Sequence, residues 1–281
     1  MLTFIELCAG TAAVSLRLHH RHARPPVSRM GAKTGYADTI LRVLGLRPGQ
    51  RADRYVWCEP DPGVRLLLHA YRDRELATAA AEIIRGWADE DPRALWERLR
   101  AEGPAQCPPV DAREVARWVF CHARTHRIGD GYAEERDPRP NRTGYQGQGP
   151  DRQTLQTRLI DALILPATIA NDARAIDPPQ LPPGVVVYID PPYQDTTGYA
   201  HAFPRSEWLP LVRAWKASGA TVCISEAEPI PDLIAEGWHA VEITNERKGQ
   251  KRTFSKQQAE WLTLSDPPKW RPSVQQGLFS C

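Results

Sequence analysis

The chain has 281 residues, 42% hydrophobic and 25% charged, a balance that excludes a disordered or fibrous protein and is long enough for one large α/β domain with an insertion. Its formal net charge of only +2 excludes a uniformly basic surface, so any face that binds nucleic acid must be local. No apolar run has the length of a membrane span, and the first residues lack the features of a secretory signal, so we expect no membrane partner.

The N-terminal part predicts a strand, a turn of small residues and a helix. Residues 2–7 form an apolar run, residues 8–13 are small enough for a ligand to approach the backbone, and residues 14–19 predict a helix. This order is typical of a nucleotide-binding βα unit, with a tight turn that binds no ligand as the alternative.

Lys33 lies two positions after Gly31, and Thr34 is predicted to cap a helix that runs to Leu46. A lysine at such a turn is well placed to bind a carboxylate or phosphate. The next strand, residues 55–58, ends at Glu59, where an acidic residue commonly binds ribose hydroxyls, whereas Asp61 is predicted to cap the following helix.

Residues 73–160 differ from the rest of the chain. Helical patterns at 76–87, 92–99 and 112–126 precede a polar, glycine-rich segment with residue types that contact bases, namely Arg127, Asn141, Arg142 and Tyr145. A solvent-exposed loop is the alternative reading of this segment. From residue 154 a helix is predicted to pass into a strand at 167–170, which ends at Asn171 and Asp172.

The most informative stretch is residues 185–193. A β-branched run predicts a buried strand, and two prolines end it, so Asp190 is expected at the carboxyl edge of the sheet. The Asp190 carboxylate and the Pro191 carbonyl could together accept both N–H groups of an exocyclic amine, and Tyr193, held beyond Pro192, could stack on a base. A plain proline turn with a surface tyrosine is the alternative.

The remaining elements are predicted as helices at 206–217 and 230–236 and strands at 220–225, 239–244 and 259–264. The last two strands are joined directly by a loop, so we expect an antiparallel hairpin. Its loop is the most basic run of the chain and suits phosphate contacts, through Arg247, Lys248, Lys251 and Arg252. A solvated hairpin tip is the alternative, and the segment from Asp266 is expected to be peripheral.

Taken together, these residues resemble the Dam-like DNA adenine-N6 methyltransferases. Residues 4–14 are similar to the family's cofactor loop, with Glu6 and Gly10 at matching positions, and residues 190–193 match its catalytic motif. Residues 29–33 resemble the motif that holds the cofactor carboxylate, although in the family this motif comes before the cofactor loop. Thr11 and Ala12 stand where glycines are common.

The resemblance implies a seven-stranded mixed-sheet, Rossmann-like methyltransferase fold with an inserted recognition region. It implies cofactor-binding segments at 1–72, a target-recognition insertion at 73–160, a catalytic part at 161–265 and a tail at 266–281. The implied cofactor is S-adenosyl-L-methionine. Its implied contacts are Glu6, Leu7, Cys8, Ala9, Gly10, Thr11, Arg29, Lys33, Glu59, Pro60, Asn171, Asp172 and Asp190. The implied catalytic residues are Asp190, Pro191, Pro192 and Tyr193.

The sequence and the resemblance thus predict an enzyme that methylates adenine N6 of a flipped base in double-stranded DNA. The oligomeric state stays open, with a monomer favoured. Cytosine N4 or an RNA amino group as the target, and an inactive DNA-binding module, stay open as alternatives, as do roles in restriction, phage protection or regulation. Six cysteines without C-x-x-C spacing, three of them in apolar runs, favour reduced residues in a cytoplasmic protein. We expect no metal, because the histidines at 19–22 have no cysteine or carboxylate at ligand spacing.

Overall fold

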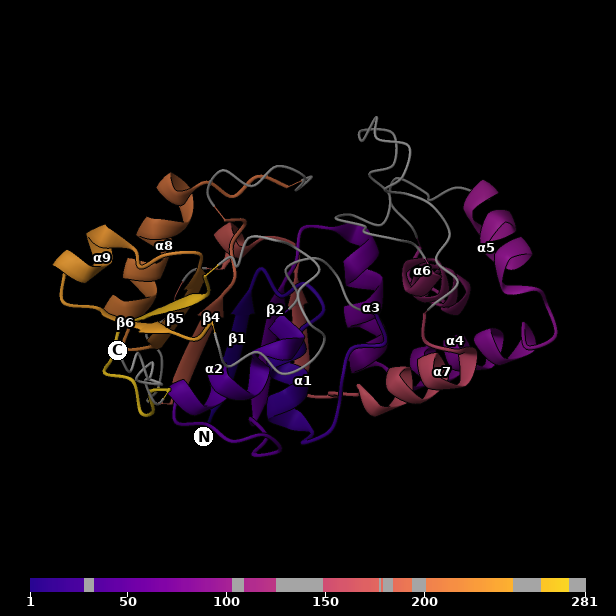
Figure 1. Cartoon of the computed structure of the whole chain (residues 1–281), viewed down its shortest axis with the longest axis horizontal. Helices are drawn as coiled ribbons and strands as arrows, with labels where there is room; N and C mark the ends of the chain where they lie inside the picture. The colour runs from indigo at the N-terminus through magenta and orange to yellow at the C-terminus, as the bar shows by residue number, and fades with distance from the viewer. Residues whose placement is uncertain are drawn as a thin grey trace, which may run out of the picture.

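The computed structural model describes residues 1–27, 33–102, 109–124, 149–176, 178, 184–193, 201–244 and 259–272. In these residues helices cover both faces of a mixed β-sheet, and a further group of helices lies beside it (Figure 1). No helix within these ranges combines the length and the apolar character that a membrane crossing requires.

The sheet consists of β1 (Thr3–Leu7), β2 (Arg54–Cys58), β3 (Ala167–Ala170), β4 (Val185–Ile189), β5 (Thr221–Glu226), β6 (His239–Glu242) and β7 (Trp261–Leu264). Their order in space is β3-β2-β1-β4-β5-β7-β6. The first five strands pair in parallel, whereas β7 is antiparallel to both β5 and β6. The expected seven-stranded mixed sheet and the predicted C-terminal hairpin are therefore confirmed.

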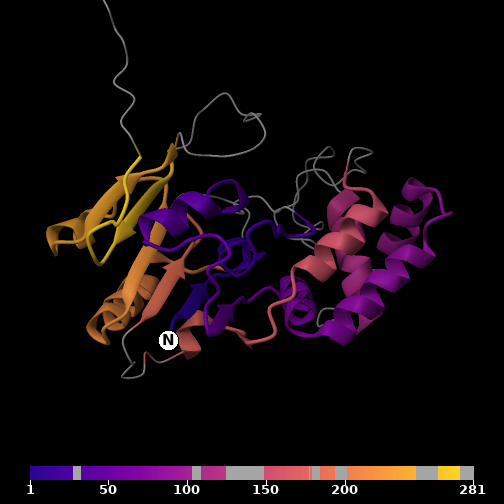
Figure 2. The ribbon, with the colours of Figure 1, turned by 90° about the horizontal axis from the view of Figure 1, so that it is seen from below.

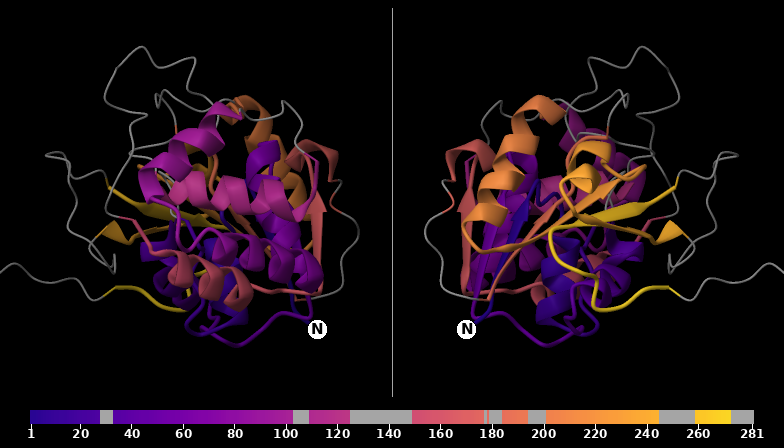
Figure 3. Two further views of the ribbon diagram at one scale, coloured as in Figure 1. Left: turned by 90° about the vertical axis from the view of Figure 1, so that its right-hand side faces the viewer. Right: turned by 90° about the vertical axis from the view of Figure 1, so that its left-hand side faces the viewer.

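Alternation along the strands separates two apolar cores. In β1, Phe4 packs on the face covered by α1 (Ala13–His19), α2 (Ala37–Val43) and α3 (Pro62–Arg72). Ile5 packs on the opposite face, which is covered by α8 (Arg205–Ala217) and α9 (Pro231–Ala235). Figure 3 shows these layers from both ends of the sheet. Because helices cover both faces, β4 is buried at every position, which explains its continuous apolar sequence.

The predicted insertion contains a group of helices, α4 (Arg74–Gly86), α5 (Pro92–Ala101), α6 (Ala112–Arg124) and α7 (Arg152–Asp161). α4 packs against α6 and α7, and the group is joined to the sheet through α3 (Figures 1 and 2). Asp73, Asp91 and Asp151 cap three of these helices by accepting hydrogen bonds from backbone amides. The helical patterns in this region are thus confirmed, with ends shifted by a few residues.

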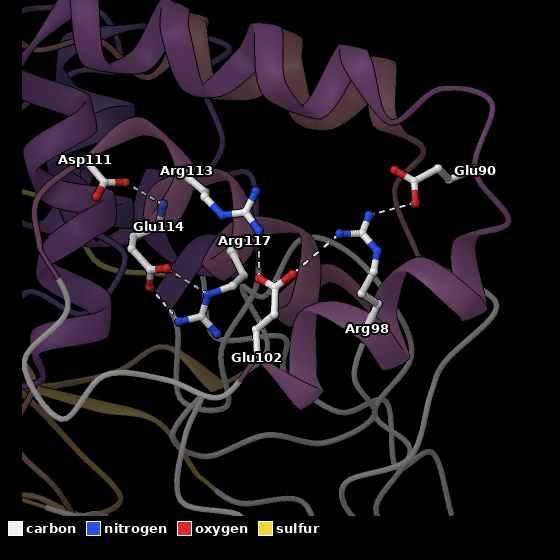
Figure 4. Close-up of polar contacts among 7 residues, drawn as sticks. All are labelled: Glu90, Arg98, Glu102, Asp111, Arg113, Glu114 and Arg117. Carbon is white, nitrogen blue, oxygen red and sulfur yellow. Dashed lines mark hydrogen bonds and ion pairs between the residues drawn. The ribbon is translucent and has the colours of Figure 1, made fainter.

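Arginines of this helical group are paired with carboxylates of the same group (Figure 4). Arg98 lies 2.7 Å from Glu90. Glu102 lies between two arginines, 3.5 Å from Arg98 and 2.9 Å from Arg113. Arg117, which is buried, lies 2.5 Å from Glu114 in the same helix. The described contacts of these side chains therefore fasten α5 to α6 and stabilise the group itself.

Two predictions about local structure are wrong. Thr34 does not cap a helix: it lies inside a separate 3-10 turn, η1 (Lys33–Gly35), which is closed by a bond from Tyr36 N to Lys33 O. α2 starts after Tyr36 without a side-chain cap and ends before Leu46. The predicted helix from residue 154 likewise ends at Asp161, and a connection leads from there to β3.

The described part of the C-terminal segment contacts α2. Lys269 N donates to Val43 O of α2 at 2.9 Å, and the Arg42 guanidinium lies 4.4 Å from the centre of the Trp270 ring. Gly45 has a φ of 75°, and a Cβ added there would lie 2.8 Å from Lys269 Cγ. Lys269 and Trp270 therefore pack onto α2 and the residue that follows its end, and residues 266–272 stay exposed or partly exposed.

Candidate functional site

The candidate site lies along the edge of the sheet where the parallel strands end. The residues that directly follow β1, β2, β3 and β4 are Cys8, Glu59, Asn171 and Asp190. Glu226 is the last residue of β5. Because β7 runs antiparallel, the residue before it, Glu260, lies at this same edge. The topology therefore gathers polar side chains from distant parts of the chain.

The turn after β1 has an unusual backbone with open space beside it. Cys8, Gly10 and Ala12 have φ values of 63°, 51° and 50°, in the left-handed region. The turn is held by hydrogen bonds of 2.8 Å from Ala9 N to Cys58 O and from Ala12 N to Ala9 O. A Cβ added to Gly10 would meet no described atom within 4 Å. Among the described atoms, the space beside Gly10 is therefore open.

Glu59 joins the end of β2 to this turn. Its Oε2 accepts a hydrogen bond from Gly10 N at 2.7 Å, and its Oε1 accepts one from Asp61 N at 3.0 Å. The carbonyl of Pro60 accepts from Arg65 at 2.6 Å, which fixes the backbone beside Glu59.

Asp61 has the structural role that the sequence predicts. Its Oδ1 accepts from Gly63 N at 2.8 Å and Val64 N at 3.2 Å, in the first turn of α3. The helix-capping prediction is confirmed, and the ligand role of Glu59 stays a prediction.

Glu6 lies beneath the turn rather than above it. It is 2% exposed, and its Oε1 accepts from Ser15 N in the first turn of α1 at 3.3 Å. Its Oε2 has no hydrogen-bond partner among the described residues. Burial raises the pKa of Glu6 to about 8, and the charge of Asp190 adds to this, against the opposing bond from Ser15. Glu6 therefore supports the start of α1 in its protonated form, and its contact with a cofactor stays a prediction.

Asp172 lies at the end of β3 and is engaged by its neighbour. It caps η3 (Ala173–Ala175) by accepting from Arg174 N at 2.9 Å, and the Arg174 guanidinium lies 2.8 Å from its Oδ2. These bonds lower the pKa of Asp172. Arg174 also binds Glu207 of α8 at 2.6 Å, and Asn171 is exposed. The predicted cofactor roles of Asn171 and Asp172 stay untested predictions.

Asp190 is held by a buried lysine. Lys33 Nζ lies 2.9 Å from Asp190 Oδ1 and 3.5 Å from Glu260 Oε1, and it donates a hydrogen bond to the Tyr193 hydroxyl at 2.6 Å. The Tyr193 hydroxyl in turn donates to Glu260 Oε1 at 2.6 Å. Lys33 is only 6% exposed, so its charge depends on these carboxylates. The described carboxylate partners of Lys33 thus belong to the protein itself, and its contact with a cofactor carboxylate stays a prediction.

Two hydroxyl groups extend this cluster across the sheet. The Tyr188 hydroxyl donates to Ser225 Oγ at 2.9 Å, and Ser225 Oγ donates to Glu260 Oε1 at 3.1 Å. Tyr188 and Asp190 share one face of β4, and Ser225 lies on the same face of β5. Strands β4, β5 and β7 therefore contribute to one hydrogen-bonded network around Asp190.

The environment of this edge is acidic and poorly solvated. Burial raises the pKa of Asp190 to about 6; Lys33 opposes this rise and the charge of Glu260 adds to it. Burial also raises the pKa of the Cys8 thiol, and the negative charges of Glu59 and Asp190 raise it further. Asp190 is therefore ionised at neutral pH but gains a proton under mildly acidic conditions.

Glu226 lies on the opposite face of the sheet from Ser225. It is 2% exposed; its Oε2 accepts from Ala227 N at 3.2 Å, and its Oε1 lies 3.9 Å from Arg205, beyond hydrogen-bond distance. Burial raises its pKa to about 7.

The sequence reading did not identify Tyr188, Ser225, Glu226 or Glu260 as site residues. Glu260 could have been identified from the predicted hairpin. Because the final strand is reversed, the start of that strand lies at the edge where the parallel strands end. Nine predicted site residues lie outside the described ranges, and their roles stay predictions. They are Arg29, Arg127, Asn141, Arg142, Tyr145, Arg247, Lys248, Lys251 and Arg252.

Among the residues that the structure describes, no three histidine, cysteine or acidic side chains are grouped to hold a metal ion. A scan against protein-family models finds no match, and a search of the curated proteins finds none either.

Proposed function

We propose that the protein is an S-adenosylmethionine-dependent methyltransferase that acts on the N6 amino group of adenine in double-stranded DNA. The observation that carries the proposal is the position of Asp190, Pro191, Pro192 and Tyr193 directly after β4, next to the open turn after β1. The strand order reverses between β1 and β4, and open α/β sheets bind ligands at such a point. The resemblance of these residues to the Dam-like enzymes agrees with this geometry.

The turn after β1 fits the cofactor on three points. Gly10 has open space where a side chain would otherwise lie. Thr11 Oγ1 is buried and has no hydrogen-bond partner among the described residues, so a polar atom is left for a ligand. Glu59, at the end of β2, is bonded to Gly10 N of this turn, at the position where an acid commonly binds ribose hydroxyls. When bound, S-adenosylmethionine supplies an electrophilic methyl group.

Asp190 and Pro191 are suited to hold an amino group. The ionised Asp190 carboxylate accepts one N–H and the Pro191 carbonyl accepts the other, so the nitrogen lone pair is directed out of the base plane. Tyr193 stacks on the base, which contributes about 1–3 kcal/mol. The base must leave the duplex to reach this edge. With the cofactor bound, Asp190 would hold the amino nitrogen beside the methyl group and would accept the proton that the methylated nitrogen loses.

Lys33 competes with the amino group for Asp190. Its ammonium nitrogen lies 2.9 Å from Asp190 Oδ1, a distance suited to a nitrogen donor, so an amine that takes this same oxygen replaces Lys33 there. The carboxylate is thereby hydrogen-bonded both with and without the base. We assign the reaction to the cytoplasm, where free thiols such as those of Cys8 and Cys58 persist.

The pairing of Lys33 with Asp190 also favours a second candidate, a protein that binds DNA without transferring a methyl group. In such a protein Lys33 would stay on Asp190 and exclude the amine. Cytosine N4 and RNA amino groups present the same kind of nitrogen to Asp190, so the product nucleoside decides among these targets.

Label transfer tests the proposal directly. The protein is incubated with labelled S-adenosylmethionine and either unmethylated double-stranded DNA or RNA, and the nucleosides are separated after digestion. We expect label in N6-methyladenine from DNA, its loss in Asp190→Ala, and parent activity in Asp232→Ala, which changes an exposed residue of α9. DNA binding without any label supports the second candidate, and label in cytosine or RNA refutes the assigned target.

A further inference from the structure

We propose that Glu260 is a positioning residue of this site: it fixes the Tyr193 ring through its hydroxyl and keeps Lys33 paired when an amino group replaces Lys33 on Asp190. The identity of the amino group rests on the proposed function. The pairing of the side chains does not, because it follows from the contacts among the described residues.

The contacts converge on one oxygen of Glu260. Its Oε1 accepts hydrogen bonds from the Tyr193 hydroxyl at 2.6 Å and from Ser225 Oγ at 3.1 Å, and it lies 3.5 Å from Lys33 Nζ. Glu260 is 6% exposed, and its backbone N donates to Thr244 Oγ1 at 2.9 Å. The carboxylate is therefore a fixed acceptor, held by the backbone on one side and by three donors on the other.

The bond to Glu260 orients the Tyr193 ring. The hydroxyl of Tyr193 accepts from Lys33 and donates to Glu260, so both of its hydrogen-bonding roles are used in this network. The Lys33 ammonium also lies 4.7 Å from the centre of the ring. A ring held at its hydroxyl cannot rotate away from the sheet edge, which preserves the surface on which a base would stack.

Glu260 also gives Lys33 a second carboxylate. A buried cation that loses its partner is strongly destabilised, so Lys33 could not leave Asp190 for an unpaired position. The two carboxylate oxygens lie 2.9 Å and 3.5 Å from Lys33 Nζ, so a small shift of the ammonium transfers it from Asp190 to Glu260. The neutral amine then takes the place on Asp190, and Lys33 keeps one carboxylate partner, Glu260.

The two partners have opposite effects on the protonation of Asp190. Loss of the positive charge of Lys33 is expected to raise the pKa of Asp190, and loss of the negative charge of Glu260 is expected to lower it. The other titratable groups that act electrostatically with Asp190 stay the same in both variants; they are Glu6, Cys8, Tyr188, Tyr193 and Glu226.

The deciding experiment is a ¹³C NMR titration of the whole protein labelled at aspartate carboxyl carbons, with the Asp190 signal assigned by its loss in Asp190→Asn. We expect the titration midpoint of Asp190 to fall in Glu260→Gln, to rise in Lys33→Gln, and to stay unchanged in Glu242→Gln, which changes an exposed carboxylate of β6. A midpoint in Glu260→Gln equal to or above that of the parent overturns the proposal. If Glu260→Gln does not fold, an Asp190 titration midpoint in Lys33→Gln that does not rise above that of the parent overturns the proposal.

A binding measurement tests the exchange itself. With the cofactor site saturated by S-adenosylhomocysteine, adenosine serves as the probe of the amine position. Glu260→Gln should weaken its binding by about 10-fold or more, the usual effect of losing a hydrogen bond to a charged group, whereas Lys33→Gln should strengthen it. Equal affinities for the parent and Glu260→Gln contradict the exchange. Failure of the parent to bind adenosine or methylate DNA counts against the proposed function instead, because the titration requires neither.

Discussion

Replacing Glu6 by glutamine is expected to stabilise the protein at neutral pH. Burial raises the pKa of Glu6 from 4.5 to about 8. The folded state therefore binds a proton more tightly than the unfolded state, and the stability that this proton contributes is present below about pH 4.5 and is lost as the pH rises through about 8. Between pH 4.5 and pH 7 the free energy of unfolding therefore falls by about 3 kcal/mol because of Glu6, at about 1.4 kcal/mol per pH unit.

Glutamine cannot ionise, and its side-chain oxygen can still accept the hydrogen bond from Ser15 N. Urea denaturation of Glu6→Gln should therefore give a free energy of unfolding about 3 kcal/mol above that of the parent at pH 7 and nearly the parent's value at pH 4.5. Glu242→Gln, in an exposed position, serves as the control. A difference between Glu6→Gln and the parent that stays constant from pH 4.5 to 8 would refute the reasoning.

Three further predictions concern other residues of the site. Asp61→Ala should lower the free energy of unfolding by about 1 kcal/mol because two amides of α3 lose their acceptor, and Asp61→Asn should retain most of it in the same urea titration. The kcat/KM of methyl transfer should fall as the pH decreases through about 6, where Asp190 gains its proton, and a flat profile from pH 5 to 8 would contradict this role. Tyr193→Ala should raise the KM for DNA more than Tyr193→Phe does, because phenylalanine keeps the ring on which a base stacks. Calorimetry should find the same cofactor affinity in both variants as in the parent. A larger loss of cofactor affinity than of DNA binding argues against stacking.

The parts of the fold that could be predicted are those with a local cause. The run from Val185 to Ile189 is buried on both sides, so its strand is visible as a continuous apolar pattern. The final hairpin follows from two apolar runs joined directly by a loop, which excludes a parallel connection. Asp61 precedes a proline and an apolar helix, which is the sequence pattern of a capped start.

Other features depend on contacts across the fold. Thr34 has the local preference of a cap, but the 3-10 turn at Lys33–Gly35 brings Lys33 against Tyr193, 160 positions away in the chain. No pattern near Lys33 specifies this partner. Glu260 is an ordinary acidic residue in sequence and becomes part of the site only because β7 is reversed. The partners of such charged residues come from distant parts of the chain, so they could not be predicted from the local sequence.

The most direct test of the central claim is the nucleoside content of DNA from an unmethylated host that expresses the protein. Mass analysis after complete digestion should find N6-methyladenine with the parent protein and none with Asp190→Ala, whose folding is checked by its urea transition. The absence of N6-methyladenine with the parent, or an equal amount with both proteins, would contradict the account that Asp190 binds the reacting amino group.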